Sequence, residues 1–198
     1  MEKQAKKLHY NAPVTLTFAF AALGVLALGM ITNHNSTRFL FSNFGTSFLD
    51  PFQYVRLFTH ILGHANWEHF SSNFLIILLL GPMLEEKYSS KIIFEMIVIT
   101  AFVTGLLNTM LFDTALLGAS GIVFMMILLS SFANAELGRI PLTLVIVVII
   151  FIGKEVVSGI MLQDNISQVT HIIGGLCGGI FGYRKGSRKW FYRLEIKE

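Results

Sequence analysis

The stretch LGASGIVFMMILLSS, residues 117–131, carries no charged residue and opens with glycine, alanine and serine close together. Apolar runs recur along the chain at about 14–31, 67–84, 92–112, 118–134, 142–159 and 167–183. Each is near the ~20 residues that a helix needs to cross the hydrocarbon core of a bilayer. Because lipid cannot hydrogen-bond to an exposed backbone, segments that cross it must be helical. The pattern predicts an all-α, polytopic membrane protein built as a bundle of six transmembrane helices.

The composition supports a membrane protein and excludes several other classes. Of 198 residues, 54% are hydrophobic and only 14% are charged, an excess of apolar surface that one small soluble core could not bury. Neither a linker nor a fixed repeat interrupts the chain, so we expect one membrane domain over residues 1–198. The single cysteine, Cys177, allows neither an intramolecular disulfide nor a cysteine-based zinc site. The basic residues flank apolar runs, which indicates topology and not nucleic-acid binding.

The distribution of basic residues predicts the orientation in the membrane. If the six runs alternate in direction, twelve of the 15 Lys and Arg residues fall on one side, and Arg38, Arg56 and Lys154 fall on the other. Loops rich in Lys and Arg stay in the cytoplasm, so both termini are expected there. The minimal six-span form, without an added domain or an organelle presequence, is typical of a bacterial cytoplasmic membrane.

The longest connection between apolar runs, at about 32–66, is neither polar like a solvated loop nor apolar enough to span a membrane. Its phenylalanines recur at helical spacing, as Phe41, Phe44, Phe48 and Phe52. This spacing favours a segment that lies in the interface of the outer leaflet. A loop packed on the helix ends is an equally good interpretation.

Four polar residues lie in the outer half of three predicted spans: His69 and Asn73 in the second, Ser120 in the fourth and His171 in the sixth. A polar group at this depth costs free energy unless it has a partner or a water-filled cavity. Each has another explanation when taken alone. The small-residue cluster around Ser120 favours helix packing, and His69 with Asn73 suits an interhelical hydrogen bond. His171 alone could be a satisfied buried histidine, a proton-relay residue or a metal ligand. Their shared depth indicates one site.

Glycines follow His171 at three, seven and eleven positions, as Gly174, Gly178 and Gly182. They line one face of a helix and permit the close approach of another. If the partner is the Gly118–Gly121 end of the fourth span, Ser120 and His171 can come within hydrogen-bonding reach. A serine in contact with a histidine is the minimal unit that activates a hydroxyl nucleophile.

These residues also match a known family. The chain resembles the rhomboid proteases in three motifs that occur in the family's order: His69 with Asn73, Gly118 with Ser120 and Gly121, and His171 with Gly174 and Gly178. Further similarities are Arg56, His60, His64 and, at the inner end of the second span, Glu85. The resemblance covers roughly residues 50–183.

The resemblance implies an intramembrane serine endopeptidase that cleaves transmembrane proteins near the outer membrane face. Ser120 would be the nucleophile and His171 the general base. The two would form a dyad, with no carboxylate as a third catalytic member. His69, Asn73 and the backbone N–H of Ser120 would form the oxyanion hole. Substrates would enter sideways from the lipid bilayer past a mobile gate formed by the fifth span and the loop after it, and neither a cofactor nor a metal is implied. The structural glycines of the motifs would be Gly118, Gly121, Gly174 and Gly178.

Two positions depart from the family. Phe124 stands where the family often has a tyrosine, four residues after Ser120. Its ring can pack against the His171 imidazole but cannot donate a hydrogen bond. Val55 replaces the family's usual tryptophan before Arg56, so the detailed structure of the first outer loop is open.

Two alternatives are left. A transporter or a metal-binding membrane protein could use His60, His64 and His69, two of which stand four residues apart, although no carboxylate or cysteine accompanies them. A catalytically inactive rhomboid-like scaffold could bind membrane proteins without cutting them, although the chain retains the motif residues. The sequence does not indicate the natural substrate or the oligomeric state.

Overall fold

The computed structural model describes residues 8–47, 49–132, 140–150, 153 and 165–195. These residues form helices and no strand, and an isolated antiparallel bridge pairs Asn43 with Leu116. The all-helical prediction is therefore confirmed for the described part of the chain. The helices are α1 (Pro13–Ile31), α2 (Asn35–Leu40), α3 (Pro51–Thr59), η1 (His60–Leu62), α4 (Trp67–Tyr88), α5 (Ser90–Leu111), α6 (Ser120–Ser131) and α8 (Asn165–Glu195), and residues 142–150 are helical as well.

The predicted apolar runs coincide with helices wherever the structure describes them. α1, α4 and α5 begin within two residues of the predicted starts, and α6 begins at Ser120. Of the fifth run, residues 142–150 and 153 are described, and the others, including Lys154, lie outside the described residues. Judged by length and composition, α1 and α5 are the described helices that could cross a membrane, and α6 is a shorter apolar helix.

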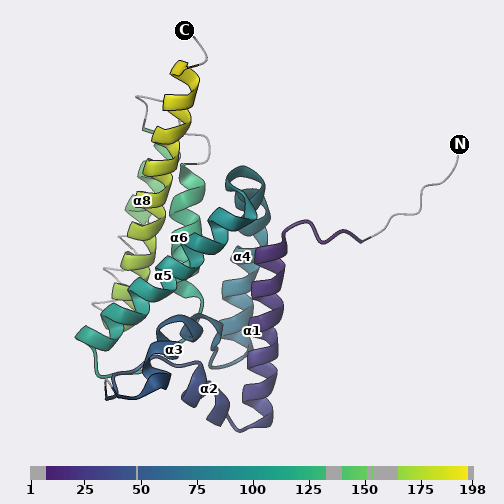
Figure 1. Ribbon diagram of the computed structural model, residues 1–198, viewed down its shortest axis with the longest axis vertical. Helices are drawn as coiled ribbons and strands as arrows, with labels where there is room; N and C mark the ends of the chain where they lie inside the picture. The colour runs from purple at the N-terminus through teal and green to yellow at the C-terminus, as the bar shows by residue number, and fades with distance from the viewer. Residues whose placement is uncertain (1–7, 48, 133–139, 151–152, 154–164, 196–198) are drawn as a thin grey trace, which may run out of the picture.

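The helices form two neighbouring groups. α6 and α8 run side by side, and α5 crosses them obliquely (Figure 1). α4 contacts both α1 and α6, so it connects the two groups. The short helices α2 and α3 lie at the lower end of the molecule in Figure 1, where α4 and α6 begin.

Aromatic packing joins α4 to α1. The Phe74 ring meets the Phe18 ring edge-on, with 5.1 Å between centroids, and stacks on Phe70 at 4.7 Å. A different face of α4 exposes large apolar side chains, since Leu75 is 72% and Leu79 74% accessible. An outward face of this kind marks an interaction surface, and on a long helix it suits contact with lipid.

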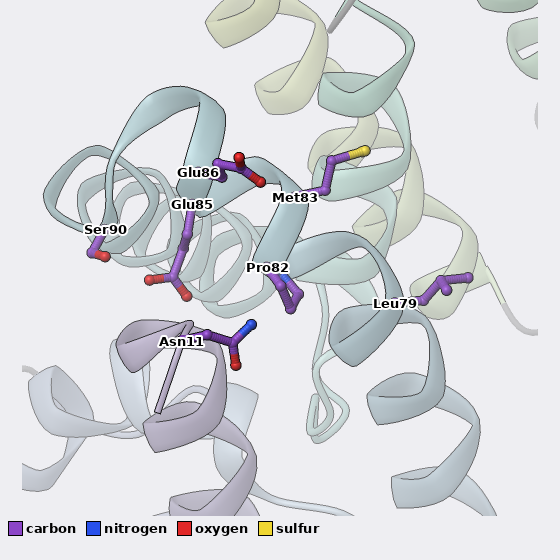
Figure 2. Close-up of a pocket in the computed structure, with 7 residues that line it drawn as sticks. All are labelled: Asn11, Leu79, Pro82, Met83, Glu85, Glu86 and Ser90. Carbon is purple, nitrogen blue, oxygen red and sulfur yellow. The ribbon is translucent and has the colours of Figure 1, made fainter. Parts of the chain in front are cut away.

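Glu85 holds the far end of α4 to the start of α1. Its carboxylate oxygens accept hydrogen bonds from the backbone N–H groups of Val14, at 3.2 Å, and Thr15, at 2.6 Å. These N–H groups lie in the first turn of α1, where they have no partner within the helix and where the helix dipole favours a negative charge. Figure 2 shows Glu85 pointing towards Asn11 and the start of α1, at a pocket between the two helices. This pocket is at the opposite end of α4 from His69.

The connection between α1 and α4 is not one continuous helix. The chain is non-helical between α2 and α3, so the helical interpretation of the phenylalanine spacing is wrong for Phe41 and Phe44, and Phe48 lies outside the described residues. The physical reason is a strong helix start after this segment. The Asp50 side chain accepts a hydrogen bond from the Phe52 N–H at 2.9 Å, and Pro51 occupies the first position of α3.

Arg56 organises the same connection. Its side chain is only 2% exposed, and it donates hydrogen bonds to Asp50 at 2.7 Å and to Thr46 at 3.0 Å. The hydrogen bond from Arg56 lowers the pKa of the Asp50 carboxyl group, which is therefore charged at neutral pH. The Phe44 ring lies 4.5 Å from the guanidinium carbon. Val55 is exposed, so this network forms without a tryptophan at that position.

Candidate active site

α6 and α8 meet along the glycine face predicted from the sequence. A Cβ atom on Gly174 would collide with the backbone of Gly121, and a Cβ on Gly178 would collide with the backbone of Met125. Gly121 in turn faces Thr170, whose Cγ2 lies 3.4 Å from the position of a Gly121 Cβ. Helix backbones approach this closely only where side chains are small or absent. The predicted close contact between these two helices is confirmed.

This contact sets the positions of Ser120 and His171. Ser120 is the first residue of α6 and precedes Gly121, while His171 follows Thr170 on α8. Phe124, one turn further along α6, packs on the His171 imidazole with 4.3 Å between ring centroids. The predicted ring contact is thus confirmed. The serine and the histidine are both partly buried, and each is adjacent to a residue of the helix contact.

At Gly118, the loop before Ser120 packs closely against the start of α4. The Gly118 φ of +117° is one that L side chains rarely adopt. A Cβ there would lie 2.6 Å from Cε1 of the His69 imidazole and 3.8 Å from Nδ2 of Asn73. His69 and Asn73 stand one turn apart on α4 and both face the loop that leads to Ser120. The structure therefore gathers the predicted site residues at one end of α4, α6 and α8.

His64 lies directly behind this loop and is fully buried, at 0% exposure. Its Nδ1 is 3.2 Å from the carbonyl oxygen of Leu62, and its Nε2 is 3.3 Å from Nδ2 of Asn73 and 3.4 Å from the backbone nitrogen of Ala119. Its ring also meets His69 edge-on, with 5.0 Å between centroids. The sequence indicated His64 only as a residue shared with the family and as a candidate metal ligand, because it lies in a non-helical segment where no periodicity relates it to α4.

His60 supports the loop through η1. Its carbonyl oxygen accepts a hydrogen bond from the Gly118 N–H at 3.0 Å. Its Nδ1 lies 3.2 Å from the carbonyl oxygen of Arg56, and its Nε2 lies 3.3 Å from the Thr104 hydroxyl. Burial lowers the pKa of both His60 and His64 to about 4, so the two imidazoles are neutral at pH 7.

The geometry gives no support to a histidine metal site. Within the described residues, no three His, Cys, Asp or Glu side chains gather closely enough to hold a metal ion. The ring nitrogens of His60 and His64 face protein groups instead. These rings therefore act as parts of the scaffold around the loop.

Comparison with protein families adds an independent finding. The family model of the Rhomboid domain matches residues 51–188, which is more than half of the chain. The match includes α4, α5, α6 and most of α8, and so every residue of the candidate site. No curated protein gives a significant match.

Proposed function

The chain belongs to the rhomboid family of integral membrane proteins, and from this premise we propose that it is an intramembrane serine endopeptidase. Members of the family are in general serine proteases that act within the membrane. The observation that supports the proposal most is the contact of Gly174 with Gly121, next to which Ser120 and His171 lie. A serine in contact with a histidine is the minimal unit that activates a hydroxyl nucleophile, and the place of both residues beside this helix contact supports such a dyad.

In the proposed reaction, Ser120 Oγ attacks the carbonyl carbon of a substrate peptide bond while His171 takes the hydroxyl proton. His171 then donates this proton to the leaving amine, the C–N bond breaks, and an acyl-enzyme on Ser120 remains. A water molecule, deprotonated by His171, attacks the carbonyl carbon of the acyl-enzyme. The ester bond to Ser120 Oγ then breaks, His171 returns the proton to Oγ, and the second product leaves as a carboxylic acid. No carboxylate is needed as a third member.

The tetrahedral intermediate carries a negative charge on the former carbonyl oxygen. The groups proposed to bind it are the side chains of His69 and Asn73 and the backbone N–H of Ser120. Since Ser120 is the first residue of α6, its N–H has no partner in the preceding turn, and the helix dipole adds positive potential there. Loss of one such donor typically lowers the rate by ~10²–10³-fold.

We further propose that six helices span a bacterial-type membrane with both termini in the cytoplasm. The apolar α1 and α5 and the exposed Leu75 and Leu79 on α4 suit this arrangement, as does the distribution of basic residues. The candidate site then faces the outer half of the membrane, beside α2 and α3. Substrates would be transmembrane proteins that enter sideways from the bilayer past the fifth span, part of which is outside the described residues.

A serine-reactive fluorophosphonate probe tests the proposal in detergent. We expect covalent labelling of the wild type and none of Ser120→Ala, because the probe captures a hydroxyl group that a neighbouring base activates. Labelling of His171→Ala should fall strongly for the same reason. Ser130→Ala is a matched control on α6, since the Ser130 hydroxyl donates to the Ile127 carbonyl at 2.7 Å, and this variant should label like the wild type.

The alternatives predict different results. An inactive rhomboid-like scaffold would leave the folded wild type unlabelled, and labelling that survives in Ser120→Ala would place the nucleophile elsewhere. A metal-dependent protein would lose its activity on treatment with a chelator, whereas the proposed dyad should not.

A further inference from the structure

We propose that His64 is a positioning residue for the proposed reaction: it fixes the orientation of the Asn73 amide and of the backbone next to Ser120. The inference rests on the proposed function and adds a residue that supports the groups of the proposed oxyanion hole. His64 would touch neither the substrate nor the reacting atoms. It would act through the two groups that its Nε2 contacts.

The contacts of His64 are consistent with a single tautomer. A carbonyl oxygen can only accept, so the 3.2 Å contact between Nδ1 and the Leu62 carbonyl requires the proton on Nδ1. Nε2 is then an acceptor. Both groups that face Nε2 are donors, namely the backbone N–H of Ala119 and the side-chain nitrogen of Asn73. One protonation state therefore satisfies all three contacts.

This tautomer determines which way the Asn73 amide points. An unprotonated Nε2 attracts the amide N–H and repels the amide oxygen, so the nitrogen is held towards His64 and the loop. The same nitrogen lies 3.8 Å from the position of a Gly118 Cβ, on the side of the loop that precedes Ser120. One of its two hydrogens bonds to His64, and the other is left for an acceptor at the site.

The contact with Ala119 restrains the backbone in the same way. The Ala119 N–H belongs to the peptide unit that immediately precedes the one carrying the Ser120 N–H. Its hydrogen bond to Nε2, together with the bond from the Gly118 N–H to the His60 carbonyl, ties two consecutive N–H groups of the loop. The Ser120 N–H is therefore presented by a peptide that cannot rotate freely.

The surroundings of His64 keep it in its neutral form. The rings of Phe70 and Phe74 lie edge-on to it, with 5.5 and 5.6 Å between centroids, and His69 lies on another side. Burial first, and the neighbouring His69 second, lower the pKa of His64 to about 4. At neutral pH, Nε2 is therefore available as an acceptor.

Two substitutions separate a positioning role from simple packing. His64→Phe keeps a ring but removes the acceptor, whereas His64→Gln keeps a carbonyl oxygen that can accept near the place of Nε2. We expect His64→Phe to lower kcat about 10–100-fold with little change in KM, because the donors act mainly in the transition state. His64→Gln should stay within about threefold of the wild type. His9→Phe, the same change at an exposed histidine, should have no effect.

A double-mutant cycle with Asn73→Ala tests whether His64 acts through Asn73. The kcat loss caused by His64→Phe should be smaller in the Asn73→Ala background than in the wild type, since one of its two targets is already missing. Equal losses in both backgrounds, equal losses for His64→Phe and His64→Gln, or wild-type kcat in His64→Phe would each overturn the inference. A wild type without turnover would instead contradict the proposed function.

The tautomer of His64 can be measured in the wild-type protein, without any substitution. In the wild-type protein in detergent, nitrogen NMR of ¹⁵N-labelled histidine should show His64 protonated at Nδ1 and unprotonated at Nε2 at neutral pH. This measurement remains decisive if His64→Phe does not fold. A proton on Nε2 would refute the inference, because that nitrogen could then accept from neither Asn73 nor Ala119.

Discussion

Gly118 and Phe124 illustrate how single residues shape the candidate site. The positive φ of Gly118 disfavours a side chain, and a Cβ atom there would lie only 2.6 Å from the His69 ring. Phe124 supports His171 by ring contact alone, at 4.3 Å between centroids, where the family often has a tyrosine. The imidazole is therefore held in place through packing at this position, and any hydrogen bond that a tyrosine hydroxyl could make is absent.

The spacing of residues predicted part of the site and missed another part. The sequence could predict the four candidate residues that lie on helices, because position along a helix determines depth in the membrane and the face of the helix. These residues are Ser120, His69, Asn73 and His171. The position of His64 at the site could not be predicted in this way, since His64 precedes α4 in a non-helical segment. Its partners become visible only when the fold brings Ala119 back against it.

Asn73→Ala tests the proposed oxyanion hole at this scale. The substitution removes a donor to charge that develops mainly in the transition state, so kcat should fall by roughly 10–10³-fold with KM little changed. Residual activity should exceed that of Ser120→Ala, because the nucleophile and base remain. Asn11→Ala changes the same side chain at the opposite end of the molecule and serves as the control. Wild-type turnover in Asn73→Ala would leave Asn73 as a packing residue.

At the scale of elements, the pair α6 and α8 forms the centre of the site. The sequence predicted their contact because the glycines of α8 share a helix face. The phenylalanine spacing left two interpretations of the segment between α2 and α3 open, and the Asp50–Pro51 helix start shows where α3 begins. The sequence placed the end of the last helix near residue 183, whereas α8 continues to Glu195, since an apolar run marks only the part of a helix suited to lipid.

Neighbouring glycines on α8 offer a matched test of this contact. A Cβ on Gly178 would meet the backbone of Met125, whereas a Cβ on Gly179 meets nothing within 4 Å. Gly178→Ala should destabilise the protein by about 1–3 kcal/mol through overpacking and should reduce labelling of Ser120. Gly179→Ala should be neutral or should stabilise by up to about 1 kcal/mol, because alanine favours the helix. Thermal unfolding in detergent measures both. Equal unfolding temperatures would show that the helices do not meet at Gly178.

At the scale of the whole molecule, the two ends of the helix bundle have different roles. One end carries the candidate site, where His60 of η1 and the following His64 accept hydrogen bonds from the loop that precedes Ser120. At the other end, Glu85 binds the start of α1 to α4 by two backbone hydrogen bonds. Between the two ends, α4 exposes apolar side chains such as Leu75 and Leu79. The sequence indicated both ends through their motifs, but not the hydrogen bonds that hold them.

The central claim is that Ser120 and His171 cut membrane proteins as a dyad, and proteolysis in a lipid bilayer tests it most directly. The purified protein and a single-span substrate are reconstituted together in liposomes, and the cleavage site is mapped by mass spectrometry. We expect the wild type and Ser130→Ala to cut the substrate near the outer end of its transmembrane segment. Ser120→Ala and His171→Ala should leave it intact while unfolding at the wild-type temperature. Cleavage at the same bond by folded Ser120→Ala would contradict the account.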